Sequence, residues 1–275
     1  MCKLKSAIVL KDRIFMPDYD SHERMIKELG LKDDYLGASK TFVRVELSPE
    51  NGDVFSAIEN WKLTVDQDIR PEWFSEDECK LLLIEKVKEW ATTHILVGID
   101  DTELSGESVC YIKDCKNVTA CDSSSVTAYG SSSVTAYDSS SVTACDSSSV
   151  TAYDSSSVTA YDSSSVTAYG SSSVKACGSS SVTAYDSSSV KACGSSSVTA
   201  YGSSSVTAYG SSSVTAYGSS VITNSLFLTW KKQDDLMLKD RSTFKDNHSG
   251  TIYQAGAFKF VPVDSGKAIG EQKGI

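Results

Sequence analysis

An eight-residue unit repeated along the middle of the chain constrains its fold more than any other feature. The unit reads D/G-S-S-S-V-T-A-Y, and valine recurs every eight residues from Val118 to Val214, after which Ile222 keeps the spacing. A period held this long is typical of a solenoid, in which each repeat packs on its neighbours. A flexible Ser-rich linker would have no reason to hold valine in register. The repeats therefore predict a β-solenoid.

Residue preferences within the unit predict its strand, its turn and its two faces. Val and Thr favour strands, whereas Gly or Asp followed by Ser favours a turn. Because side chains alternate across a strand, Val and Ala share a face with the third residue of the unit, a Ser, while Thr and Tyr point the other way. Lysine replaces this Thr at positions 175 and 191, and cysteine replaces the Tyr at 121, 145, 177 and 193. Neither replacement suits a small, close-packed core, so the Thr and Tyr positions are expected at the surface.

This assignment defines a predicted core and a candidate surface ladder. The core valines are Val126, Val134, Val142, Val150, Val158, Val166, Val174, Val182, Val190, Val198, Val206 and Val214. The surface threonines are Thr127, Thr135, Thr143, Thr151, Thr159, Thr167, Thr183, Thr199, Thr207 and Thr215. The surface tyrosines are Tyr129, Tyr137, Tyr153, Tyr161, Tyr169, Tyr185, Tyr201, Tyr209 and Tyr217.

The spacing of the substitutions bears on how many units make one coil. Lys175 and Lys191 are sixteen residues apart, whereas Cys121 and Cys145 are twenty-four apart. Two units would give a flattened coil of two sheets, and three units a triangular coil. A core of Val, Ala and Ser is too thin to fill a triangle. We therefore favour two units per coil, with three as the alternative.

The segments that flank the repeats predict other kinds of structure. In residues 1–105 the stretches "SAIVL" and "RIFM" predict a short hairpin or a bent strand. "TFVRVELS" predicts a half-buried strand, because Phe42, Arg44 and Glu46 alternate with Val43, Val45 and Leu47, and "WKLTVDQD" and "HILVGID" predict further strands. "DSHERMIKELG" predicts a helix with Asp20 as N-cap, and "SEDECKLLLIEKVKEWATTH" a longer helix with Ser75 and Glu78 as a capping box. We expect four regions: an α/β N-terminal capping domain at 1–105, the octapeptide-repeat solenoid at 106–225, a β cap at 226–263 and a disordered tail at 264–275.

The charge and hydropathy of the chain argue against several classes of partner. The formal net charge is −10, without the clustered Lys and Arg that nucleic acids require, so we expect no nucleic-acid partner. No apolar run approaches the length of a membrane span, and the first residues lack the long apolar region of a signal peptide. These features predict a cytoplasmic protein with no membrane partner, in which the eight cysteines are reduced.

A few residues could carry chemistry, although none forms a recognised motif. The carboxylates of Asp66, Asp68, Asp100 and Asp101 could cooperate in metal binding or acid–base work, but acids at strand ends and in loops are more simply solvated. His22 and His94 fall at predicted helix ends, and His248 in a turn-like stretch. There is no GxSxG elbow and no phosphate-binding glycine loop. We therefore expect no catalytic, cofactor-binding or metal-binding residues and no cofactor.

Two resemblances bear on the repeats and on the whole chain. "TAYGSSSVTAYG" resembles the repeats of bacterial ice-nucleation proteins, which form sixteen-residue β-solenoid coils; the likeness covers Val118 to Ile222. That family presents paired threonines as a flat array of hydroxyls, whereas Ser and Val stand at these positions here. The whole chain is similar to uncharacterised proteins of gut Firmicutes and their phages, through "MCKLKSAIVLKDRIFMPDYDSH", "FVRVELSP", "VDQDI" and "TIYQAG". This second resemblance implies a bacterial or phage origin.

Together these features predict a non-enzymatic structural or interaction protein. A rigid solenoid would present rows of Ser, Thr and Tyr to an unknown protein partner or to another copy of itself, and tyrosine is favoured at interfaces. Three alternatives stay open. They are an ice-binding or ice-nucleation-like protein, an acidic DNA-mimic inhibitor, and an enzyme in residues 1–105. The DNA mimic is disfavoured because the repeats hold only six Asp, offset by two Lys.

Overall fold

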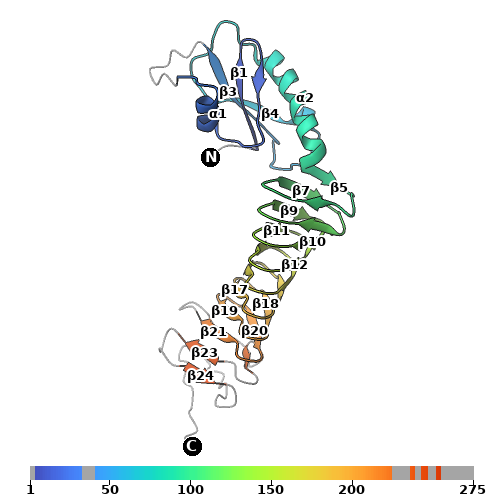
Figure 1. Ribbon diagram of the computed structural model, residues 1–275, viewed down its shortest axis with the longest axis vertical. Coiled ribbons are helices and arrows are strands. Elements are labelled where there is room, and N and C mark those ends of the chain that lie inside the picture. Colours follow the sequence, from blue (N-terminus) through green and yellow to red (C-terminus); the bar gives the residue numbers. More distant parts are fainter. Residues whose placement is uncertain (1–3, 33–40, 225–235, 239–242, 247–251, 255–275) are drawn as a thin grey trace, which may run out of the picture. The chain divides into compact units, whose positions relative to one another are not determined.

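The computed structural model describes residues 4–32, 41–224, 236–238, 243–246 and 252–254. The chain divides into two compact units, Met1–Ile95 and Leu96–Ile275 (Figure 1). Among the described residues, neither α-helix is long and apolar enough to span a membrane.

The first unit is built on a four-stranded antiparallel sheet with strand order β2-β1-β3-β4. The strands are β1 (Lys5–Leu10), β2 (Ile14–Phe15), β3 (Phe42–Ser48) and β4 (Lys62–Val65), with a short 3-10 helix, η1 (Ile58–Asn60), before β4. β1 and β2 form the expected hairpin, and the strands expected in "TFVRVELS" and "WKLTVDQD" are confirmed.

Two α-helices, α1 (His22–Glu28) and α2 (Glu76–His94), cover opposite faces of this sheet. The buried side chains of α2 pack with Val43, Val45 and Leu47, whereas those of α1 pack with Phe42 and Ile8. Since both faces are covered, β3 is buried on both sides and not half-buried as its alternation predicts.

The N-cap residue was predicted correctly at α2 and wrongly at α1. Ser75 caps α2, its hydroxyl accepting a hydrogen bond from the Glu78 backbone N–H at 3.4 Å. At α1 the N-cap is Ser21, not Asp20. The Asp20 carboxylate instead accepts the Ser6 backbone N–H of β1 at 3.1 Å, so this acid ties the chain before α1 to the sheet.

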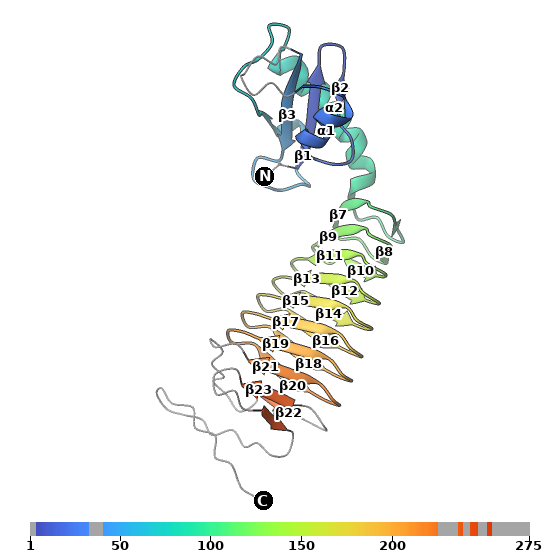
Figure 2. The same ribbon diagram turned by 60° about the vertical axis from the view of Figure 1, so that its left-hand side comes forward.

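The second unit is a β-solenoid whose strands alternate between two parallel sheets (Figure 2). From residue 118 to residue 208, each repeat strand pairs in register with the strand sixteen residues further along, as Val134 does with Val150 and Val150 with Val166. Two units therefore make one coil, as favoured above, and the three-unit alternative is wrong.

The even-numbered strands from β6 to β22 form a nine-stranded sheet, and the odd-numbered strands from β5 to β23 form an eleven-stranded sheet together with β24. The even-numbered strands are β6 (Glu103–Leu104), β8 (Val118–Ala120), β10 (Ser133–Ala136), β12 (Ser149–Ala152), β14 (Ser165–Ala168), β16 (Ser181–Ala184), β18 (Ser197–Ala200), β20 (Ser213–Ala216) and β22 (Leu236–Leu238). The strands of the eleven-stranded sheet are β5 (Ile95–Val97), β7 (Val109–Lys113), β9 (Ser125–Tyr129), β11 (Ser141–Ala144), β13 (Ser157–Ala160), β15 (Ser173–Ala176), β17 (Ser189–Ala192), β19 (Ser205–Ala208), β21 (Val221–Asn224), β23 (Thr243–Asp246) and β24 (Ile252–Gln254).

The core between the two sheets contains the residues that alternation predicts. Every repeat valine from Val126 to Val214 is at most 2 % exposed, and the alanines and third-position serines are buried with them. The threonines are half-buried, while Lys175 and Lys191 at the same position are exposed. The predicted core and outward faces are confirmed.

The turn between units explains why its first residue is Asp or Gly. This residue has a positive φ in every coil, for example 56° at Asp138 and 65° at Gly170. Glycine adopts this left-handed conformation freely and Asp tolerates it better than most residues. The buried serine that follows then fills the corner, as where the Ser156 hydroxyl donates to the Tyr153 carbonyl at 2.8 Å.

The solenoid extends beyond the predicted repeat region at both ends. β5 and β6 already belong to its sheets, so the boundary expected at residue 105 is too late. β22 and β23 extend the sheets in parallel, and β24 then pairs antiparallel with β23, within the region expected as a cap. Residues 226–235 and the tail expected at 264–275 lie outside the described residues.

Candidate functional site

One edge of the solenoid carries six tyrosines stacked one above another. Adjacent rings have centroids 4.8–5.1 Å apart and planes 7–10° from parallel. We call this set the tyrosine ladder; its members are Tyr137, Tyr153, Tyr169, Tyr185, Tyr201 and Tyr217. Each follows directly after an even-numbered strand, from β10 to β20.

The parallel, in-register pairing of the coils accounts for the stacking. Neighbouring strands lie about 4.8 Å apart, which places equivalent rings at stacking distance. Each ring pair contributes about 0.5–1.5 kcal/mol beyond the area it buries. The ladder therefore stabilises the coil stack and presents a continuous strip of ring edges and hydroxyls.

The opposite edge is irregular. Its residues, which we call the mixed edge, are Tyr129, Cys145, Tyr161, Cys177, Cys193 and Tyr209. Here cysteines interrupt the tyrosines, and the Lys191 ammonium lies 5.0 Å from the centre of the Tyr209 ring. The nine tyrosines predicted as one surface class therefore fall on two edges. The sequence could have shown this division, because tyrosines on the same edge are separated by multiples of sixteen residues.

The threonine positions divide in the same way. On the nine-stranded sheet, in-register threonines run without interruption; this threonine row consists of Thr119, Thr135, Thr151, Thr167, Thr183, Thr199 and Thr215. On the eleven-stranded sheet, the corresponding row has Lys175 and Lys191 in its middle. The tyrosine ladder and the threonine row thus lie on the same strands, and we call them together the uniform face.

Aspartates at the turns bond across coils. Asp146 accepts the Gly130 backbone N–H at 2.9 Å, and Asp186 accepts that of Gly170 at 3.1 Å. Asp100 and Asp101, considered above as possible chemical groups, do the same at the first coils, where they accept from the Lys116 backbone and the Asn117 side chain. These acids therefore have a structural use within the solenoid.

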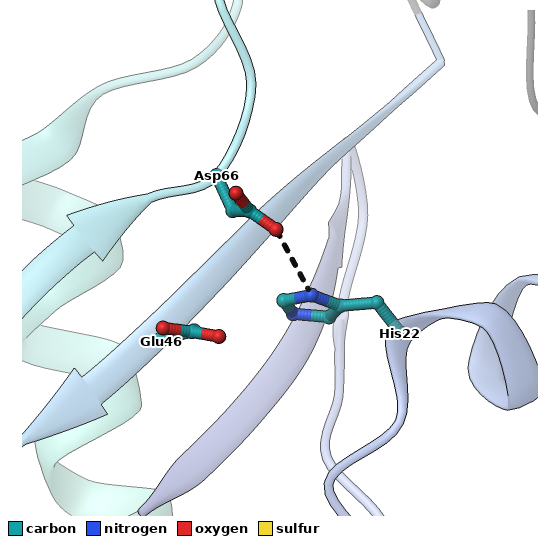
Figure 3. Close-up of side chains that lie close together, drawn as sticks. All are labelled: His22, Glu46 and Asp66. Atoms are coloured by element: carbon teal, nitrogen blue, oxygen red, sulfur yellow. Dashed lines mark ion pairs between the residues drawn. The ribbon is translucent and has the colours of Figure 1, made fainter. Parts of the chain in front are cut away.

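In the first unit, three ionisable side chains come together. His22 of α1, Glu46 of β3 and Asp66, just after β4, point toward one another (Figure 3). Their nearest donor atoms all lie within 4.8 Å of each other. Sequence reasoning noted His22 and Asp66 separately and missed Glu46. Asp68 is exposed in the same loop, and no cluster in the described residues includes it.

The other two histidines have different surroundings. His94 ends α2, with its ring stacked on that of Trp90 and its Nδ1 2.8 Å from the Trp90 carbonyl oxygen, a local helix-end arrangement as expected. His248 lies outside the described residues.

Comparison with known proteins gives no relative for this chain. No family model, no curated protein and no solved structure matches it. The resemblance of the repeats to ice-nucleation proteins and the bacterial or phage origin therefore stay predictions.

Proposed function

We propose that the protein is a non-enzymatic interaction protein that uses the uniform face of its solenoid. One observation carries the proposal: from Thr135 to Tyr217 the substitutions within the repeats avoid this face. The lysines at 175 and 191 and the cysteines at 145, 177 and 193 all belong to the eleven-stranded sheet or its mixed edge. A chain that needed its repeats only for stiffness would tolerate the same replacements on both sides.

The physical properties of this face suit a partner with a regular repeat. Its hydroxyls and rings recur at the coil spacing of about 4.8 Å. The coil stack holds them in place, so little side-chain entropy is lost on binding. Tyrosine also combines a large apolar ring with a polar hydroxyl, which favours it at interfaces.

The partner that matches this repeat most simply is a second copy of the chain. Two uniform faces have the same spacing, so ladder can pack against ladder along their whole length. The proposal includes the cytoplasmic location predicted from the sequence, where thiols stay reduced.

Sedimentation velocity over a range of protein concentrations tests this proposal. We expect the wild-type chain to self-associate, and a Tyr169→Ser, Tyr185→Ser double variant to associate at least tenfold more weakly. The matched control is Tyr161→Ser, Tyr209→Ser, which removes two rings from the mixed edge and should associate like wild type. A wild-type chain that stays monomeric, or equal weakening by both double variants, contradicts the proposal.

The unbroken threonine row favours ice binding as a second candidate. Regular hydroxyl rows on a flat sheet can order water, and of the two solenoid sheets, as far as their residues are described, only the nine-stranded one has such a row without lysine. A droplet-freezing assay, with Thr151→Lys, Thr167→Lys as the variant, tests this candidate. Freezing at the temperature of buffer alone would eliminate it.

A further inference from the structure

The cluster of His22, Glu46 and Asp66 in the first unit is independent of the solenoid surface. Its members come from three segments: the first residue of α1, the middle of β3 and the loop after β4 (Figure 3). His22 and Glu46 are each 7 % exposed, whereas the Asp66 side chain is 63 % exposed. The cluster is therefore anchored inside the unit and open to solvent on one side.

The hydrogen bonding of His22 determines which ring nitrogen is available. Its Nε2 lies 3.1 Å from the Val45 carbonyl oxygen, which can only accept a hydrogen bond, so Nε2 carries a proton. Its Nδ1 faces Asp66 Oδ2 at 3.6 Å, which is too long for a hydrogen bond. In metal-binding histidines, one ring N–H commonly donates to a backbone carbonyl and so directs the other nitrogen at the metal.

Glu46 supplies a second, independent indication. Its carboxylate points toward His22, and among the described residues it has no hydrogen-bond or ion-pair partner (Figure 3). The Glu46 side chain is mostly buried, but its carboxylate oxygens keep contact with solvent, so an ion can reach them. Nearby Asp66 adds a second negative charge, and a cation between the two carboxylates would offset their repulsion.

The basic side chains of β1 and β3 in this sheet, Lys5 and Arg44, have other contacts. The Lys5 ammonium donates to the Pro17 carbonyl at 2.7 Å and lies 3.4 Å from Asp20. The Arg44 guanidinium lies 5.4 Å from the centre of the Phe42 ring. Within the described part of the chain, neither of these cations forms an ion pair with Glu46.

We propose that His22 Nδ1 and the carboxylates of Glu46 and Asp66 bind one divalent first-row transition-metal ion. One imidazole and two carboxylates form a mixed nitrogen and oxygen set, which suits Mn²⁺, Fe²⁺ or Zn²⁺. Metal–ligand bonds of about 2.0–2.2 Å place adjacent donor atoms about 3.0–3.5 Å apart. The 3.6 Å between His22 Nδ1 and Asp66 Oδ2 is close to this range. The donor atoms that the three side chains offer, one from each, all lie within 4.8 Å of one another, and rotation of the exposed Asp66 side chain would bring its carboxylate closer to the other two.

Neighbouring contacts hold the ligands in position. The Asp66 backbone N–H donates to the Arg44 carbonyl at 2.9 Å, and the Gln67 side chain accepts the Arg44 backbone N–H at 3.0 Å, which fixes the loop to β3. With three protein ligands, water fills the other coordination positions. The bound ion would join α1, β3 and this loop, so its binding should also stabilise the first unit.

Titration of the full-length, chelator-treated chain with Mn²⁺, followed by electron paramagnetic resonance, tests the proposal. Mn²⁺ prefers oxygen and nitrogen ligands, so the free cysteines compete little for it. We expect one Mn²⁺ per chain. Asp66→Asn and Glu46→Gln should each weaken binding at least tenfold. Asp68→Asn removes an exposed acid from the same loop and should bind as wild type does.

Two further measurements separate metal binding from a structural effect of the substitutions. Zn²⁺ should displace bound Mn²⁺ from the wild-type chain, because it binds such sites more tightly. Mn²⁺ should raise the melting temperature of wild type and Asp68→Asn but not that of Asp66→Asn. If Glu46→Gln does not fold, the Mn²⁺ affinity of Asp66→Asn tests the proposal alone, because Asp66 is exposed and its replacement should not disturb folding. Absence of saturable Mn²⁺ binding, or equal affinity in Asp66→Asn and wild type, overturns the proposal.

Discussion

Cys193 and Cys177 lie side by side on the mixed edge, at the same position of two adjacent coils. The residues before them, Ala176 and Ala192, are direct register partners of β15 and β17. Burial, followed by the neighbouring Cys177, raises the pKa of the Cys193 thiol. Of the four cysteines at the Tyr position of the repeats, these two alone are one coil apart, so they are the pair that could form a disulfide between adjacent coils.

Mild oxidation should therefore join Cys177 to Cys193. Adjacent parallel strands are about 4.8 Å apart, within the Cα separations of about 4.4–6.8 Å that disulfides span. Peptide mapping after diamide treatment should find this one disulfide, and Cys177→Ser should abolish it. Cys121 and Cys145 are on opposite edges and should stay reduced. A Cys121–Cys145 disulfide would contradict the sixteen-residue coil.

Removal of one coil and removal of half a coil should affect the uniform face differently. Deletion of residues 155–170 removes sixteen residues and keeps the remaining ladder tyrosines on one edge. Deletion of residues 179–186 removes eight residues and transfers Tyr201 and Tyr217 to the edge opposite Tyr169, so no more than three ladder tyrosines stay stacked. Both chains should keep β-sheet circular dichroism, because each unit packs alike on its neighbours.

Only the half-coil deletion should lose self-association, by at least tenfold in sedimentation velocity. The one-coil deletion serves as its control, since it is shorter yet keeps five stacked tyrosines. Equal association of the two chains would show that ladder continuity has no part in the interaction.

Cysteine labelling should separate core thiols from edge thiols. Burial raises the pKa of Cys79 and of Cys110 to about 11, so at pH 8 only about one molecule in a thousand has either as the reactive thiolate. In the native chain, iodoacetamide should reach the half-buried edge cysteines well before these two. Denaturant should make all cysteines react. Rapid native labelling of Cys110 at pH 8, measured by mass spectrometry, would contradict the described core.

The sequence predicted the solenoid well because the environment of each unit depends only on its nearest neighbours. The thin core of Val, Ala and Ser, together with the sixteen-residue spacing of Lys175 and Lys191, favoured two units per coil, and alternation within one unit identified the core of all of them. The same spacing also separates the ladder tyrosines from those of the mixed edge, such as Tyr161. It could be applied to the tyrosines only once two units per coil was established, because the coil size determines which tyrosines share an edge.

The first unit was less predictable because its important contacts join distant segments. Alternation in β3 placed Glu46 on the face away from Val45, and exposure was the natural interpretation. Nothing local indicates that α1 covers this face and brings His22 to it. The Asp20 cap failed for the same reason, since its partner Ser6 lies fourteen residues away.

The buried serines provide a test of how the solenoid corners are stabilised. The Ser156 hydroxyl donates to the Tyr153 carbonyl, whereas the equally buried Ser140 hydroxyl has no partner among the described residues. Ser156→Ala should lower the free energy of unfolding by about 1 kcal/mol, because it removes a hydrogen bond and leaves a buried carbonyl less satisfied. Ser140→Ala removes a hydroxyl that is desolvated without compensation, so it should be neutral or stabilising. Urea unfolding of the two variants makes the comparison at equivalent positions of neighbouring coils. A larger loss for Ser140→Ala than for Ser156→Ala would mean that these serines act by filling space and not through their hydroxyl bonds.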